Sequence, residues 1–258
     1  MPQRIERIVS LAPNMTEIIY AVGAGDRLVG NTTYCDYPAE AKKVEKVGDT
    51  LQPNIERIVA LRAQVVLVST ASQLEAFTRQ MEQQNIPIYI TDPKSFGGVL
   101  KTIASVGELL GQHDEAQKVV NDMRSRAEAV QSAVKSEKPV RVFYQVSSEP
   151  LYTAGRDSFI TDLIKLAGGI SVTADVPGAW PKYSDESALA SQPEAIVMAS
   201  FDSMNKNGMD VAKSLKNSPA AKNGNVFGIN GDYLSRPGPR LINGLEEMAR
   251  KFHPNAFK

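Results

Sequence analysis

Two stretches of the chain carry the same pattern of a capped helix, a short turn and a strand. The segment Glu56–Val68 aligns without a gap with Glu186–Met198. A second match, Thr16–Ala24 with Thr161–Gly169, occurs in the same order along the chain, and in both copies the helix pattern runs into a glycine. Two ordered matches predict two homologous lobes.

Each lobe alternates short β-rich runs with helix-forming segments, which is typical of parallel α/β structure. Strands are expected over residues 7–11, 28–29, 65–69 and 86–90, and then over 140–146, 195–199 and 226–229. Helices are expected over residues 16–22, with Asn14 as its cap, 55–62 and 74–84, and then over 158–167, 186–191 and 239–251. The predicted fold class is therefore α/β, with two Rossmann-like lobes.

The segment between the two blocks is almost entirely helix-forming, with one break near Gly111. From His113 to Lys135 it holds no glycine or proline, and about 22 helical residues would extend ~33 Å. We expect a single long rigid helix that joins an N-terminal lobe of residues 1–112 to a C-terminal lobe of residues 138–258, with residues 113–137 as the connection. The alternative is an ordinary surface helix of one larger domain.

Composition excludes several classes of protein. Lys+Arg and Asp+Glu both number 29, so the net charge is zero and nucleic acid is not an expected partner. The one cysteine, Cys35, can form no internal disulfide, and the chain has no zinc motif. His113 and His253 are expected at the surface. No apolar run reaches the ~18–20 residues of a membrane span, and no signal-peptide pattern opens the chain.

Catalytic motifs are missing from the sequence. There is no GxSxG, no HExxH and no phosphate-binding glycine-rich loop, and Gly23-Ala24-Gly25 ends a helix rather than opening one. One cysteine also cannot hold a metal cluster, which argues against a cluster enzyme of similar two-lobed architecture. We therefore expect a binding protein and not an enzyme, with no metal site or cofactor.

Aromatic residues gather in irregular segments rather than at core spacings. Four such segments hold Tyr, Trp and charged side chains: residues 33–38, 152–158, 178–183 and 230–238. Ligands of open α/β sheets bind beyond the strand ends, and aromatic rings give a large ligand flat contact area. These loops are predicted to line a cleft between the lobes.

Glu56 and Glu186 occupy equivalent positions in the repeat. Each follows a candidate helix cap, Asn54 or Ser184, by two residues. A carboxylate in a first helical turn is stabilised by the helix dipole, which alone explains both residues. Their equivalence also suggests contact with a pseudo-symmetric basic partner.

The sequence resembles the periplasmic substrate-binding proteins of ABC importers with a rigid inter-lobe helix (class III), most closely the cobalamin-binding members. The similarity covers nearly the whole chain. Six segments carry it: Arg7–Glu17, Tyr34–Pro38, Asn54–Leu61, Tyr152–Ser158, Trp180–Glu186 and Asp232–Arg236.

The resemblance implies a role for each matching residue. Tyr34, Tyr152 and Trp180 match pocket aromatics that pack on the corrin and its lower base. Asp232 and Arg236 match residues that hydrogen-bond the corrin amides, and Asp232 and Arg236 are also close enough in sequence to pair with each other. Glu56 and Glu186 match glutamates that dock on arginines of a membrane-embedded permease dimer.

Two positions depart from the closest cobalamin binders. Thr50 and Ser69 fall where those proteins carry tryptophans, so part of the aromatic wall is replaced. The resemblance predicts a monomer, periplasmic or anchored outside the cytoplasm, that captures cobalamin or a related corrinoid in the cleft and delivers it to an ABC importer. A haem, ligated by a tyrosine, or a ferric siderophore is the alternative ligand.

Overall fold

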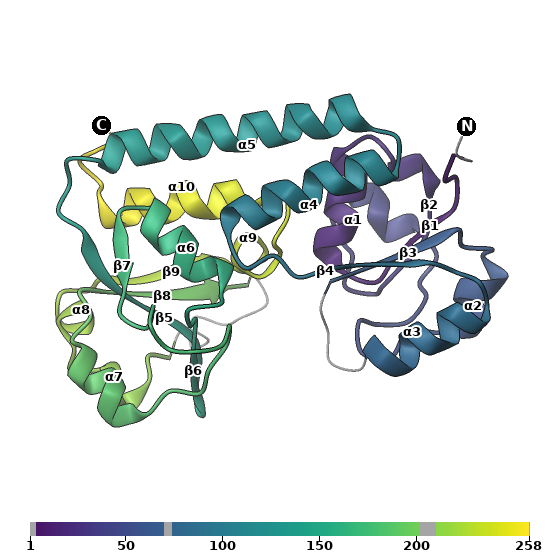
Figure 1. Ribbon diagram of the computed structural model, residues 1–258. Helices are drawn as coiled ribbons and strands as arrows, with labels where there is room; N and C mark the ends of the chain where they lie inside the picture. The colour runs from purple at the N-terminus through teal and green to yellow at the C-terminus, as the bar shows by residue number, and fades with distance from the viewer. Residues whose placement is uncertain (1–3, 70–73, 202–209, 258) are drawn as a thin grey trace. The chain divides into compact units, whose positions relative to one another are not determined.

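A computed structural model describes residues 4–69, 74–201 and 210–257, without the side chains of residues 74–76. The chain divides into two compact units (Figure 1). Residues Met1–Pro93 and Leu100–Asp122 form the first unit, and Lys94–Val99 and Met123–Lys258 form the second. The predicted two-lobed α/β fold is confirmed.

The first unit is built on a parallel four-stranded sheet of order β2-β1-β3-β4. Its strands are β1 (Ile8–Ser10), β2 (Leu28–Asn31), β3 (Val65–Ser69) and β4 (Ile88–Thr91). Its helices are α1 (Pro13–Ala21), α2 (Ile55–Ala60) and α3 (Leu74–Gln83), with 3₁₀ turns η1 (Gly25–Arg27) and η2 (Ala39–Lys43). Figure 1 shows α2 and α3 on one face of the sheet and α1 on the other.

Two helices contribute residues to both units. In α4 (Phe96–Leu109), residues 96–99 belong to the second unit and the rest to the first. In α5 (His113–Val134), a helix of 22 residues, residues 113–122 belong to the first unit and residues 123–134 to the second. The two helices are separated at Gly111, whose φ of 66° suits glycine.

The second unit is built on a mixed five-stranded sheet. Strands β6, β5, β8 and β9 pair in that order, and β7 pairs with β5. The strands are β5 (Val140–Ser148), β6 (Leu151–Thr153), β7 (Gly169–Ser171), β8 (Ala195–Ser200) and β9 (Val226–Asn230), and only β6 is antiparallel to its neighbour.

The helices of this unit cover both faces of its sheet. They are α6 (Phe159–Leu166), α7 (Asp185–Ser191), α8 (Pro219–Lys222), α9 (Gly231–Ser235) and α10 (Leu241–Phe252), with the 3₁₀ turn η4 (Lys213–Leu215). Figure 1 shows α6 and α10 on one face and α7 and α8 on the other. Phe143 and Ile196, on neighbouring strands, pack with Ala188 of α7 and Ala220 of α8.

Both copies of the predicted repeat are present. Helix α2 leads into β3, and α7 leads into β8 at the positions that the alignment assigns. Gly23 and Gly168 follow α1 and α6 with φ values of 79° and 81°, so the same left-handed residue ends the helix in each unit.

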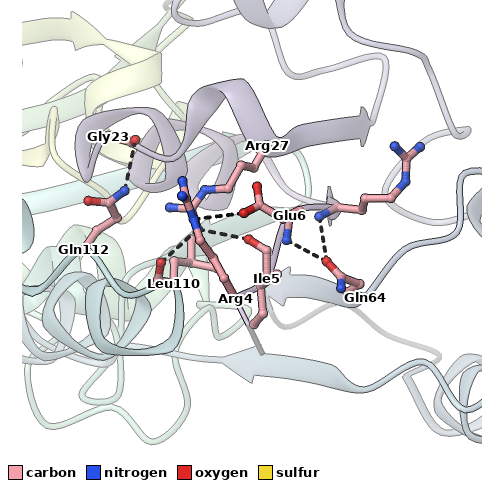
Figure 2. A network of polar contacts seen from close by, with 9 residues as sticks. Arg4, Ile5, Glu6, Gly23, Arg27, Gln64, Leu110 and Gln112 are labelled. Carbon is pink, nitrogen blue, oxygen red and sulfur yellow. Dashed lines mark hydrogen bonds and ion pairs between the residues drawn. The ribbon is translucent and has the colours of Figure 1, made fainter. Parts of the chain in front are cut away.

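A buried arginine fixes the amino-terminal end of the first unit. The Arg27 Nη1 donates hydrogen bonds to the carbonyls of Ile5 and Leu110, each at 2.9 Å (Figure 2). Gln112 donates to the Gly23 carbonyl at 3.4 Å, and Gln64 accepts from the backbone that enters β1. The network joins the entry to β1, the end of α4 and the segment after α1.

The predictions for two single residues, Asn14 and His253, were wrong. Asn14 does not cap α1, because the helix begins one residue earlier at Pro13, with Ala12 at its N-cap. A proline there lacks the N–H that a cap would satisfy. His253 is not a surface residue: it is buried, and its Nε2 lies 3.1 Å from the Gly168 carbonyl at the end of α6. His113 is exposed, as predicted, and its Nδ1 contacts the Glu108 carboxylate.

Candidate functional site

Four of the predicted ligand-binding residues lie at, near or beyond the carboxyl end of a strand. In the first unit Ser69 ends β3, and Tyr34 follows β2 by three residues. In the second unit Tyr152 is paired with Ser147 near the end of β5, and Asp232 follows β9. Parallel sheets bind ligands at this edge because their loops and helix N-termini converge there.

Tyr34 is presented by a tight turn, Thr32–Cys35, that we call the Tyr34 turn. The Cys35 N–H donates to the Thr32 carbonyl at 3.1 Å, and the Thr33 N–H donates to Gly48 at 3.1 Å. Thr32 and Cys35 are buried, whereas Tyr34 is 60% exposed. Both ends of the turn are therefore held in place, and the tyrosine ring remains available for contact.

Thr50 lies in a second turn of the first unit. The Asp49 Oδ1 accepts from the N–H groups of Leu51 and Gln52, at 2.7 and 2.6 Å, which closes the turn around Thr50. Thr50 and Ser69 are half-buried, and Leu51 is 62% exposed. An isolated exposed leucine has no sequence pattern that identifies it, so Leu51 was not among the predicted site residues.

In the second unit, the structure brings together the segments that carry Tyr152 and Trp180. The Thr153 N–H donates to Pro181, and the Gly155 N–H donates to Ala179, at 3.1 and 3.0 Å. Tyr152 also forms an antiparallel bridge with Lys182. The predicted loop at Tyr152 is in fact strand β6, because these residues pair with β5.

Trp180 rests on a neighbouring aromatic ring. Its indole packs edge-on against Phe159, with ring centroids 5.9 Å apart and an interplanar angle of 82°. The Asp157 Oδ2 accepts from the Gly178 N–H at 2.9 Å and so fixes the loop two residues before the tryptophan. Trp180 remains 44% exposed, so one edge is supported while part of its surface stays open.

Asp232 and Arg236 form the predicted ion pair, with 2.9 Å between Oδ1 and Nη2. Arg240, which was not predicted, lies 3.5 Å from the Asp232 Oδ2 and stacks over the Tyr233 ring at 5.6 Å. The predicted loop here is the short helix α9, because Asn230 caps it by accepting from the Asp232 N–H at 2.9 Å. The four-residue spacing of Arg236 and Arg240 was the sequence signal that could have identified Arg240 as a second partner of Asp232.

Glu56 and Glu186 each occupy the first turn of a capped helix. The Asn54 Oδ1 accepts from the Arg57 N–H at 2.9 Å, and the Ser184 Oγ accepts from the Ser187 N–H at 3.0 Å. Both predicted caps are confirmed, and both glutamates are exposed. Glu186 also lines a groove of about 420 Å³ in the second unit. Both carboxylates are accessible to a partner.

Within residues 4–69, 74–201 and 210–257, no group of three or more His, Cys, Asp or Glu side chains could hold a metal ion. None of the helices described is both long and apolar enough to cross a bilayer. Cys35 is a free, buried thiol.

Known proteins resemble this chain over its whole length. The family model for periplasmic binding proteins matches residues 8–233. The uncharacterized ABC transporter substrate-binding lipoprotein YvrC of Bacillus subtilis is 35% identical over 98% of this chain and 82% of its own.

Two solved structures share the fold. The periplasmic vitamin B12-binding protein BtuF of Vibrio cholerae is 29% identical, covers 100% of both chains and has a TM-score of 0.84. The periplasmic heme-binding protein RhuT of Roseiflexus sp. RS-1 is 25% identical over 98% of this chain and 99% of its own, with a TM-score of 0.84. The chain thus belongs to the periplasmic binding protein family, the non-enzymatic substrate-binding proteins of ABC transporters.

Proposed function

We propose that this protein captures cobalamin or a related corrinoid and delivers it to an ABC importer. The observation that carries the proposal is the presentation of two exposed rings: Tyr34, beyond the carboxyl end of β2, is 60% exposed, and Trp180, on the loop that pairs with β6, is 44% exposed. Rings on hydrogen-bonded loops give a large, flat ligand contact area at a low entropic cost. The similarity to BtuF supports a corrinoid.

Polar contacts to the ligand come from α9 in this proposal. A corrin carries neutral amide side chains, which need both donors and acceptors. The paired Asp232 and Arg236 supply one of each, and both side chains are mostly buried but not fully covered. Thr50 and Ser69 add hydroxyl groups at the edge of the first unit, and Tyr152 adds a ring next to the Trp180 loop.

The remaining proposed partner is the permease. Glu56 and Glu186 are exposed at helix N-termini, and we expect each carboxylate to meet an arginine of one permease subunit. The proposed location is outside the cytoplasmic membrane, in a periplasm or anchored at the cell surface, and the proposed state of the free protein is a monomer.

Haem or a ferric siderophore is the second candidate ligand. The similarity to RhuT favours haem, and a tyrosine such as Tyr34 or Tyr152 would be the iron ligand. The two ligands use the tyrosine differently, because a corrin needs only its ring whereas a haem iron needs its oxygen.

One experiment distinguishes the ligands. The protein is incubated with cyanocobalamin and with haemin in turn, desalted, and its visible absorption is recorded. Retention of the cobalamin spectrum at one equivalent supports the proposal, and retention of haem alone contradicts it. Tyr34→Phe and Tyr152→Phe are expected to leave cobalamin binding nearly unchanged, whereas for haem the substitution of the ligating tyrosine would remove the iron–tyrosinate band.

A further inference from the structure

We propose that Lys46 is a positioning residue that holds the Tyr34 turn in its ligand-binding shape without contacting the ligand. The inference rests on the proposed function in one respect, because it takes Tyr34 to be a ligand contact. Lys46 lies outside every loop that the sequence singled out.

The Lys46 ammonium is surrounded by three oxygen acceptors. Its Nζ lies 2.7 Å from the Asn31 Oδ1, 3.1 Å from the Ala41 carbonyl and 3.3 Å from the Cys35 carbonyl. An ammonium has three N–H donors, so these three acceptors match its full capacity. Hydrogen bonds to a charged donor are stronger than those between neutral groups.

These acceptors come from three different segments around Tyr34. Asn31 ends β2, Cys35 ends the Tyr34 turn, and Ala41 lies in η2, beyond it. The Asn31 Nδ2 also donates to the Ala41 carbonyl at 2.9 Å. One ammonium group therefore joins the segments before and after the exposed tyrosine.

The backbone of Lys46 is itself held in place. The Asn31 N–H donates to Glu45, and the Val47 N–H donates to Asn31, both at 2.9 Å. The Arg57 Nη1 donates to the Lys46 carbonyl at 2.8 Å. Removal of the ammonium alone should therefore release the Cys35 carbonyl and leave the backbone at position 46 in place.

Release of that carbonyl should make the turn mobile, and ligand binding would then have to order it. Ordering a backbone segment costs free energy, so the affinity should fall even though no ligand contact is removed. This effect should depend on Tyr34, since the turn matters to binding through that side chain.

The thiol of Cys35 gives a direct test that needs no ligand. It is the only cysteine, it is buried, and its Sγ lies 3.2 Å from the Thr32 Oγ1 within the turn. Lys46→Met should raise the rate at which N-ethylmaleimide alkylates the Cys35 thiol at least about tenfold. This factor corresponds to the lower end of the free energy lost with a hydrogen bond to a charged group. Lys43→Met, at an exposed lysine of η2, is the matched control and should not change the rate.

Global unfolding must be separated from opening of the turn. The free energy of unfolding, measured in urea, gives the unfolded fraction of each variant and hence the alkylation rate that global unfolding alone would produce. Only an alkylation rate above that value supports the proposal. If Lys46→Met fails to fold, Lys46→Arg, which keeps the charge, replaces it in the alkylation experiment. A planar guanidinium cannot match three convergent acceptors, so it should also raise the rate. Alkylation no faster than in the Lys43→Met control would overturn the proposal.

Titration with cyanocobalamin tests the link to the ligand. Lys46→Met should weaken binding about tenfold in the wild-type background and have no further effect in Tyr34→Ala. Equal effects in both backgrounds would contradict a role through Tyr34. If the wild-type protein does not bind cyanocobalamin, the proposed ligand is wrong, and the thiol measurement still decides whether Lys46 holds the turn.

Discussion

Arg236 lies one helical turn beyond Asp232, and its Nη2 is 2.9 Å from the Asp232 Oδ1. The two side chains are only 13% and 26% exposed, so each neutralises a charge that is partly removed from water. Loss of either one leaves its partner partly buried without that contact.

This relationship predicts that the two residues act together in ligand binding. Asp232→Ala and Arg236→Ala should each weaken cobalamin binding by about 1–2 kcal/mol, and the double variant should lose less than the sum of the two. Calorimetric titration of the four proteins checks this, with the exposed Lys222→Ala as a control expected to show no change. Additive losses would mean that the residues contribute independently.

Trp180 should be the largest single contributor to ligand affinity. Trp180→Ala should cost about 2–4 kcal/mol of binding free energy, in the range of interface hot spots. Because the indole also packs on Phe159, the free energy of unfolding has to be measured in parallel. Trp180→Phe, which keeps an aromatic ring, should retain part of the affinity. Unaltered cobalamin affinity in Trp180→Ala would contradict this location for the site.

Charge reversal at Glu56 or Glu186 should separate docking from binding. Both side chains are exposed, so Glu56→Lys and Glu186→Lys should leave cobalamin affinity in solution unchanged and strongly reduce uptake through the transporter. Glu82→Lys, at an exposed position of α3, is the matched control and should transport normally. A tenfold loss of affinity in solution for either variant would exclude a role in docking alone.

Stability at acidic pH should depend on Glu246. Hydrogen bonding from Arg126, at 2.8 Å between Nε and Oε1, lowers the pKa of the Glu246 carboxyl from its ordinary value of 4.5, and Arg250 adds to the effect. A carboxyl group with a lowered pKa in the folded state stabilises the fold at pH values above 4.5. This stabilisation is lost as the pH falls through the lower pKa of the folded protein.

Urea unfolding between about pH 6 and pH 3 measures this contribution. The wild-type protein should lose more stability than Glu246→Gln over that interval, because the glutamine cannot take up a proton. Glu128→Gln, at an exposed position of α5, is the control and should follow the wild type. Parallel pH profiles for the wild type and Glu246→Gln would contradict the prediction.

Elements with a strong local signal were predicted closely. Strand β3 has the predicted bounds, and α5 begins at His113 as expected, because uninterrupted apolar or helix-forming runs leave few alternatives. Strand β6 and helix α9 were missed because both are short. Pairing with β5, which lies outside the three residues of β6, decides that strand. Helix α9 has five residues and is too short to show an apolar periodicity, although its cap Asn230 directly precedes it.

The residues of the candidate site also fall into two groups, those with a local sequence signal and those that depend on contacts elsewhere in the chain. Asn54 and Ser184 were recognised as caps since a cap acts within one turn of its own helix. Lys46 was not recognised, because its role depends on contacts with three other segments. Arg240 was not recognised although its four-residue spacing from Arg236 was a signal, because its contact with Asp232 depends on how the segment after α9 folds. His253 was assigned to the surface for the same reason: burial against Gly168 involves two parts of the chain that are distant in sequence.

The sequence by itself determined the two α/β lobes, the repeat that relates them and the helix α5, because each of these follows from periodicity and from glycine, proline and cap positions along a continuous stretch. Tertiary structure alone decided which side chains support the predicted site. The Phe159 ring against Trp180, the second arginine on Asp232 and the three acceptors around Lys46 are contacts that only folding can assemble. Contacts between side chains from different segments depend on how the whole chain packs and on which groups become buried, and neither can be read from the sequence around one residue.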